Sequence, residues 1–127
     1  AGLGPKERIR IRNLISEVAK DKIVIIATHV VTDVEFIAKE IVMLSNGKII
    51  RSGSPSKLLK ELDGKVWNIF LSDNEIDEVN TGYKVSNISR DADGVIARII
   101  ADSYDGRWQK EAVRPNLEDL YLYLNGD

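Results

Sequence analysis

The chain lacks cysteine and long apolar runs, and neither sign of charge dominates its 127 residues. Without cysteine it has no disulfide framework, thiolate nucleophile or cysteine-ligated zinc site, which fits a reducing compartment. Its longest apolar stretches, such as Ile23 to Ala27, are far shorter than the roughly 20 residues that a membrane-spanning helix needs. The net charge of −2 comes from interspersed acidic and basic residues, so we expect no nucleic-acid partner.

The length and composition are those of a globular protein. Apolar residues make up 43% and charged residues 30% of the chain, which is ordinary for a folded domain. The length suits one compact unit or two small units that share a seam. It is too short for a complete nucleotide-binding domain together with an accessory module.

The first third of the chain predicts a helix, a strand and a second helix, in that order. Apolar residues recur at spacings of three and four over 5–20, which predicts an amphipathic helix with Gly4 at its N-cap. The apolar run from Ile23 to Ala27 shows no alternation, so it predicts a central strand that is buried on both faces. A short helix is expected over 32–39.

A hairpin and a capped helix are expected next. Strands over 41–44 and 48–51 flank the pair Asn46-Gly47, which tolerates the positive φ angles of a tight turn. Ser54 and Pro55 then suit the N-cap and first position of a helix that reaches Leu62. Helix, strand, helix and hairpin in this order indicate one edge of an α/β sheet.

The character of the chain changes at Asp63-Gly64, the best candidate for a boundary. Beyond it the sequence predicts an acidic helix or loop over 72–78 and a final helix over 116–124. Three strands are also expected, at 65–71, 83–89 and 95–101. We therefore predict an α/β part over 1–62 and a small α+β domain over 65–127.

His29 is the only histidine and follows the predicted buried strand directly. In α/β sheets, ligand-binding residues gather outside the carboxyl ends of the strands, so its position makes it a candidate site residue. A single histidine nevertheless has a structural role more often than a catalytic one.

The sequence around His29 narrows this interpretation. IVIIATH followed by TDVEFIAKEIVMLSNGKIIRSGSP is similar to the switch segment of the ATPases of ABC transporters. In that family a hydrophobic strand leads to a histidine, a short helix follows, and a strand pair precedes a proline-capped helix. With AGLGPKERIRIRNLI at the start, the resemblance covers about residues 1–62.

By this resemblance His29 is the switch histidine, which senses the γ-phosphate of ATP and helps to hold the attacking water. The opening residues Ala1, Gly2, Leu3 and Gly4 resemble the D-loop, which crosses the interface between two ATPase subunits. The family usually has aspartate where this chain has Gly4, which removes a possible contact across the dimer. The alternative that His29 only caps the end of a strand stays open.

The phosphate-binding machinery of the family is missing from this sequence. Neither Gly47-Lys48 nor Gly64-Lys65 completes a G-x-x-x-x-G-K-[ST] loop. No apolar strand ends in paired acids that would hold Mg²⁺, and there is no Ser-Gly-Gly signature. We expect no cofactor for this chain alone, which should neither bind nor hydrolyse ATP. Asp33 and Glu35 are expected on a solvated helix face rather than in a metal site with His29.

The end of the chain resembles another pattern of the family. Pro115 begins a Pro-x-Leu-Glu-Asp sequence that is similar to the ending of ATPases of the drug and antibiotic export (ABC-2) branch. Leu117, Leu120, Tyr121 and Leu124 are expected on one helical face, so this ending also fits a terminal helix that docks on the rest of the chain. The aromatic residues between 67 and 108 are expected to pack in a core rather than to stack a ligand.

The resemblance implies an α/β fold in which 1–62 is the C-terminal remnant of a P-loop NTPase core of RecA-like type. The parent subunit would use ATP and Mg²⁺, pair with a second ATPase subunit and with membrane-spanning subunits, and export a substrate. It would lie in the cytoplasm, peripheral to the inner face of the cell membrane. One alternative is a regulatory or dimerisation module that acts through 65–127. A small independent hydrolytic enzyme is a third, for which no pair of nucleophile and base is evident.

Overall fold

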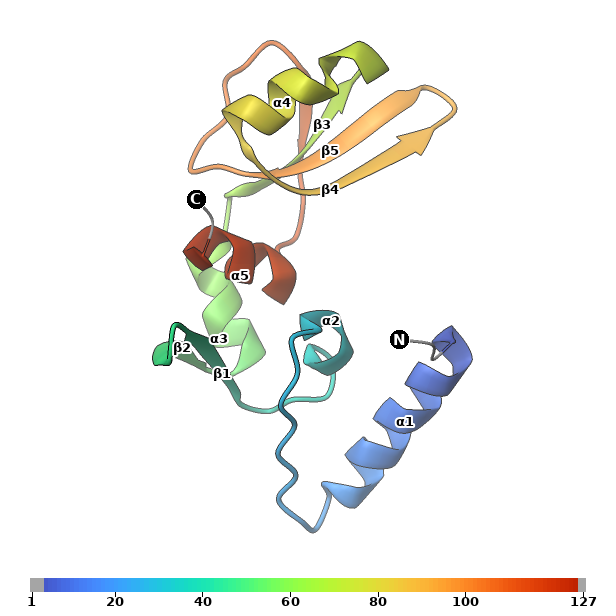
Figure 1. Ribbon diagram of the computed structural model, residues 1–127, viewed down its shortest axis with the longest axis vertical. Coiled ribbons are helices and arrows are strands. Elements are labelled where there is room, and N and C mark those ends of the chain that lie inside the picture. The colour runs from blue at the N-terminus through green and yellow to red at the C-terminus, as the bar shows by residue number, and fades with distance from the viewer. Residues whose placement is uncertain (1–3, 126–127) are drawn as a thin grey trace.

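The computed structural model describes residues 4–125, apart from the side chain of Asp33, and has a mixed α/β fold with antiparallel sheets (Figure 1). The helices are α1 (Pro5–Val18), α2 (Val31–Val34), α3 (Pro55–Leu59), α4 (Ile76–Gly82) and α5 (Leu117–Asn125). The strands are β1 (Ile41–Ser45), β2 (Lys48–Gly53), β3 (Val66–Leu71), β4 (Lys84–Asp91), β5 (Gly94–Ile100) and β6 (Gln109–Ala112). The short 3₁₀ helices are η1 (Lys60–Leu62) and η2 (Asp73–Glu75).

Helix α1 begins where the sequence predicts and ends two residues earlier. Gly4 is its N-cap and Pro5 its first residue, and the main-chain N–H of Arg8 donates to the carbonyl of Gly4 at 3.1 Å. None of its residues is buried. The helix packs only at one side, where it contacts α2 (Figure 1), so most of its apolar stripe faces outward.

The prediction of a buried central strand over 23–27 is wrong for this structure. The segment is extended but pairs with none of the described strands. Ile23 is 93% exposed and Ile25 is 89% exposed. A central strand needs a hydrogen-bonded neighbour on each side, and the strands described between residues 4 and 125 pair only among themselves.

The helix expected over 32–39 is also shorter than predicted. α2 ends at Val34, and a turn follows in which the N–H of Ala38 donates to the carbonyl of Val34 at 2.9 Å. Three of the four residues of α2 are β-branched, and such residues lose side-chain freedom against the preceding turn of a helix. The local sequence therefore favours one turn of helix rather than two.

The hairpin agrees with the sequence, and the neighbouring helix begins as predicted, although α3 ends at Leu59 and the 3₁₀ helix η1 continues to Leu62. β1 and β2 pair antiparallel, with a register shift between Met43 and Leu44. Asn46 has a φ of 52° and Gly47 a φ of 76°, as the two-residue hairpin turn demands. The hydroxyl oxygen of Ser54 accepts from the N–H of Lys57 at 3.2 Å and caps α3.

A four-stranded antiparallel sheet with the order β4-β5-β3-β6 forms the second half. The strands predicted over 65–71, 83–89 and 95–101 are confirmed as β3, β4 and β5. The fourth strand, β6, was not predicted because Gln-Lys-Glu-Ala has a weak strand propensity. It is an exposed edge strand that pairs with β3 alone.

Two hydrophobic clusters hold these elements together. Val79 of α4 packs with Ile69 of β3 and Ile99 of β5 on one face of the four-stranded sheet. The opposite face contributes Val66 and Ile100 to a second cluster, which also contains the following residues of β1, α3, η1 and α5: Met43, Leu58, Leu62, Leu117 and Leu120. Figure 1 shows α4 above this sheet and α5 beneath it, between the sheet and α3. Among the described residues, no helix is long and apolar enough to cross a bilayer.

Candidate functional site

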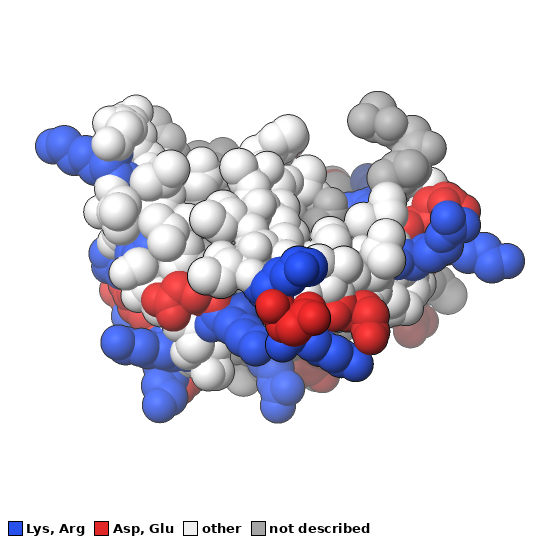
Figure 2. All heavy atoms as spheres, turned by 90° about the horizontal axis from the view of Figure 1, so that it is seen from below, with Lys and Arg blue, Asp and Glu red and all other residues white. Residues whose placement is uncertain are grey.

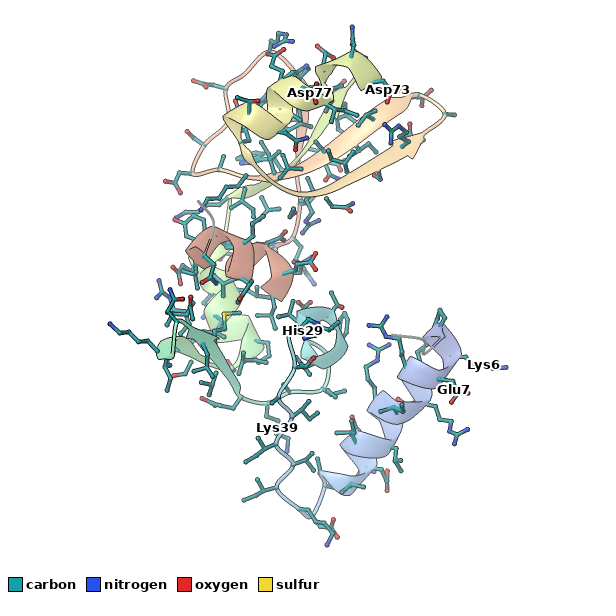
Figure 3. All side chains as sticks on the ribbon, in the orientation of Figure 1. Lys6, Glu7, His29, Lys39, Asp73 and Asp77 are labelled. Carbon is teal, nitrogen blue, oxygen red and sulfur yellow. The ribbon has the colours of Figure 1, made fainter. Side chains whose placement is uncertain are left out.

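His29 lies on the exposed segment that leads into α2. Its side chain is exposed, and the hydroxyl oxygen of the preceding Thr28 accepts from the N–H of Val30 at 3.0 Å. This bond bends the chain around the histidine, as short side chains with a hydroxyl group often do. Figure 3 shows His29 beside α2 near the middle of the molecule, whereas Asp73 and Asp77 lie at its upper end.

Glu35 does not face water alone, contrary to the expectation of a solvated helix face. It follows α2, and its Oε1 accepts from the main-chain N–H of Leu117 at 2.6 Å. One oxygen of its carboxylate is therefore engaged with the start of α5. Within residues 4–125, no group of three or more histidine or acidic residues is arranged to hold a metal ion.

The segment before His29 borders a shallow groove on α1. Ile11 and Ile15 of α1 line this groove with Ile26 and Val34, and Arg8 and Arg12 lie at its edge. Its volume is about 180 Å³. The walls of the groove are mostly apolar.

That end of the molecule carries much exposed apolar surface. Figure 2 shows a broad area free of charged residues, with lysine, arginine and acidic side chains gathered along its margin. Large apolar side chains in residues 4–40 are exposed: Leu14 is 63% and Phe36 77% exposed, and Ile23 and Ile25 are exposed as well. Where exposed apolar residues form one patch, they usually mark a site of contact with more protein.

The comparisons with known proteins point to one family over part of the chain. No family model matches. The chain is 33% identical over 57 residues, 45% of its length, to ABC transporter A family member 8 of Dictyostelium discoideum. It is 36% identical over 75 residues, 59% of its length, to human ATP-binding cassette sub-family A member 9. It is 36% identical over 64 residues, 50% of its length, to the energy-coupling factor transporter ATP-binding protein EcfA2 of Lactococcus lactis.

These partial relatives are ABC transporter ATPases. The chain spans only 7%, 5% and 22% of their lengths, in the same order. The similarity thus supports the resemblance to ABC transporter ATPases that the sequence around His29 suggests. That the chain belongs to the exporter branch, and that it is the C-terminal part of a subunit, stay predictions.

The predicted D-loop falls only partly within the described residues. Ala1, Gly2 and Leu3 lie outside them, and Gly4 is the N-cap of α1. A Cβ atom added at Gly4 would meet nothing within 4 Å, so the fold itself does not require glycine there. His29 and Gly4 are therefore the two predicted site residues whose positions the structure gives.

The sequence interpretation missed a network of polar residues at the start of α5. Arg98 of β5 donates from Nη2 to Oδ2 of Asp119 at 2.7 Å and to the carbonyl of Arg114 at 2.7 Å. Asp119 is completely buried and also accepts from the N–H of Asn116 at 2.9 Å. Two signals were present: an arginine inside an apolar strand, which needs a partner, and an acid three residues after an N-cap asparagine.

Trp67, Tyr83, Tyr104 and Trp108 pack as predicted, whereas Phe70 on the opposite face of β3 is 36% exposed. The rings of Tyr83 and Tyr104 are 5.6 Å apart and tilted by 55°. The indole Nε1 of Trp67 donates to the carbonyl of Ala101 at 3.3 Å, and that of Trp108 donates to Oε2 of Glu75 at 2.9 Å. These polar contacts, which buried indoles generally need, indicate a structural role for the aromatic residues.

Proposed function

We propose that the chain is the C-terminal part of the ATP-binding subunit of an ABC transporter. Residues 1–62 supply the D-loop and the switch-histidine segment of its P-loop NTPase core, and residues 65–127 form an accessory domain. The complete subunit couples ATP binding and hydrolysis to export of a substrate, in the manner of the drug and antibiotic (ABC-2) branch.

One structural observation carries this proposal. An apolar segment over 23–27 leads directly to His29, yet it lies extended, exposed and without a strand partner in the described part of the chain. In a parallel α/β sheet such a run is covered on both faces and paired on both edges. In this proposal the rest of an ATPase core supplies that cover, and the names of the partial relatives, an ABC transporter and a transporter ATP-binding protein, support this.

His29 performs one step of the chemistry in this proposal. An imidazole can donate a hydrogen bond to a phosphate oxygen, so His29 contacts the γ-phosphate of ATP and holds the attacking water. The phosphate loop and the acids that bind Mg²⁺ come from the remainder of the core. A second ATPase subunit meets Ala1 to Gly4 across the dimer interface, where Gly4 cannot supply the usual carboxylate.

The partners and location follow from the same proposal. Membrane-spanning subunits provide the path and the substrate choice, and the ATPase dimer closes on two ATP molecules. Such closure is a shift in population driven by a ligand at the interface. The subunit lies in the cytoplasm at the inner face of the membrane.

A variant of His29 in the complete subunit tests the proposed chemistry. His29→Ala should lower kcat for ATP hydrolysis by about 100-fold or more, because the contact forms with charge that develops in the transition state. The KM for ATP should stay within about threefold, since the other phosphate contacts remain. Lys39→Ala, at an exposed position ten residues further along, is the matched control. Equal kcat values for His29→Ala and the control would remove His29 from the mechanism.

The 127-residue chain by itself provides a second test. We expect no saturable ATP binding in a calorimetric titration, with or without Mg²⁺, because the sequence contains no phosphate loop. Tight binding would contradict the proposal. Sedimentation of the same sample addresses the alternative role of 65–127: a stable dimer disrupted by Phe70→Ser, on the sheet of that part, would favour a dimerisation module.

A further inference from the structure

Glu35 connects two segments that lie far apart in the described chain. Its carboxylate accepts from the N–H of Leu117, which is 82 positions further along. Leu117 is the first residue of α5, and the N–H groups of the first turn of a helix have no partner within the helix. A carboxylate there gains both a hydrogen bond and a favourable interaction with the helix dipole.

The same end of α5 is held from the other side by the four-stranded sheet. The carboxylate of Asp119 accepts from Asn116 of the chain before the helix and from Arg98 of β5. In return, the side-chain oxygen of Asn116 accepts from the N–H of Asp119 at 2.8 Å. The first turn of α5 is therefore fixed to β5, and Glu35 adds the segment after His29 to that assembly.

The remaining contacts of the His29 segment are few. Val31 packs against the cluster that contains Leu117 and Leu120, and α2 contacts α5. Residues 21–29 are exposed throughout. The hydrogen bond that Glu35 accepts from Leu117 is thus the main polar contact that the structure gives between this segment and the second half of the chain.

We propose that Glu35 is a positioning residue: it ties the segment that carries His29 to α5 and, through Asp119 and Arg98, to the four-stranded sheet. The charge of Glu35 also reaches Arg98. The pKa of the Arg98 guanidinium is raised, chiefly by its hydrogen bonds to Asp119, with a smaller contribution from Glu35.

This link makes the sheet and the His29 segment two ends of one coupled unit. A partner that moves α5 against the sheet also moves the anchor of Glu35, and a ligand held by His29 acts on α5 in return, because coupling between two sites is reciprocal. The consequence for ATP rests on the proposed function, whereas the link itself does not.

Nuclear magnetic resonance on the 127-residue chain measures the link. In Glu35→Ala the amide proton of Leu117 should shift upfield, because its charged acceptor is lost. Hydrogen exchange of amides 30–38 should accelerate by about tenfold to a hundredfold, the range that corresponds to loss of one hydrogen bond to a charged group. Glu35→Gln keeps an acceptor oxygen and should restore most of the protection. Glu40→Ala, an exposed acid nearby, should change neither signal.

Arg98→Lys tests whether the link continues to the sheet. Lysine keeps the charge but not the two-pronged contact, so the fold should persist while the start of α5 loosens. We expect faster exchange at 30–38 in this variant too, and shifted ring resonances of His29. Unchanged exchange at 30–38 in Glu35→Ala, or in a folded Arg98→Lys, would overturn the proposal.

The same variants in the complete subunit separate this proposal from the function. With Glu35→Ala, kcat for ATP should fall by about tenfold, KM should change little, and Glu35→Gln should recover part of the loss. A complete subunit without ATPase activity, together with the resonance changes described for the 127-residue chain, would refute the proposed function and leave the link intact. ATPase activity without those changes would refute the link alone.

Discussion

The guanidinium of Arg98 donates hydrogen bonds to both oxygens of the Asp119 carboxylate: Nε lies 3.0 Å from Oδ1 and Nη2 lies 2.7 Å from Oδ2. Asp119 is fully buried, and the side chain of Arg98 is 21% exposed. Two-pronged contacts of this kind fix orientation as well as distance. The pair therefore determines how α5 lies against β5.

Asp119→Asn should destabilise the chain strongly. The substitution leaves the Arg98 guanidinium without its counter-charge, and loss of one member of a buried pair costs about 3 kcal/mol. Urea unfolding followed by circular dichroism measures the change. Glu118→Gln, at the exposed neighbouring position, should change the free energy of unfolding by less than about 0.5 kcal/mol. Equal stability of the two variants would show that the ion pair contributes nothing net.

Leu120→Ala and Leu14→Ala should differ sharply in the 127-residue chain. Leu120 has no exposed surface, and a buried leucine replaced by alanine typically costs about 2–5 kcal/mol. Leu14 of α1 is 63% exposed, so the same change should cost less than about 1 kcal/mol. In a complete ATPase subunit the cost at Leu14 should rise, because the proposed core covers α1. If Leu14→Ala still cost less than about 1 kcal/mol in the complete subunit, the proposal that the ATPase core covers α1 would be wrong.

Gly47→Ala should weaken the β1–β2 hairpin. Gly47 has a φ of 76°, which alanine adopts only with strain, although nothing within 4 Å would obstruct its added carbon. We expect a loss of about 1 kcal/mol from backbone conformation alone. Asn46→Gly provides the comparison, since its φ of 52° suits glycine equally well. Thermal unfolding distinguishes the two, and an unaltered midpoint for Gly47→Ala would contradict the strain argument.

Glu75 should contribute to the pH dependence of stability. Hydrogen bonds from the N–H of Ser72, the indole of Trp108 and the hydroxyl of Ser72 lower the pKa of Glu75 to about 2. An unfolded glutamate has a pKa of about 4.3. Because the folded pKa is the lower one, the contribution is complete above about pH 4.3 and disappears as the pH falls toward 2.

Glu75→Gln should therefore flatten the fall in stability between about pH 4.5 and pH 2. Urea midpoints at a series of pH values measure the slope, and Asp77→Asn on the exposed side of α4 controls for the loss of one negative charge. An identical slope in the parent chain and in Glu75→Gln would contradict the lowered pKa.

The local parts of the fold were predictable from the sequence. Asn46-Gly47 specifies its turn by backbone angles, Ser54 and Pro55 specify the start of α3, and both were located correctly. Strands β3, β4 and β5 could be predicted because β-branched residues, which favour strands, recur in each of them. These features depend on neighbours in the sequence, so no partner from elsewhere was needed to infer them.

The features that depend on distant partners were harder to predict. The run at 23–27 has the composition of a buried strand, but composition does not supply neighbouring strands, and the segment remains exposed. Strand β6 likewise depends on a distant partner, because it forms by pairing with β3. In the site, the position of His29 after an apolar run was evident, whereas the contact of Glu35 with Leu117 joins residues too far apart for any periodicity to reveal.

The cluster beneath the four-stranded sheet takes Met43, Leu58 and Leu62 from before Gly64 and Val66, Ile100 and Leu120 from after it. The proposed division at 63–64 thus crosses a shared interior, although it lies at a change in sequence character. Proteolytic nicking there would leave both pieces with bare apolar faces, and they should stay associated or precipitate rather than separate. The two pieces should therefore be exchangeable between related chains only when the residues that face each other across this interior are exchanged together.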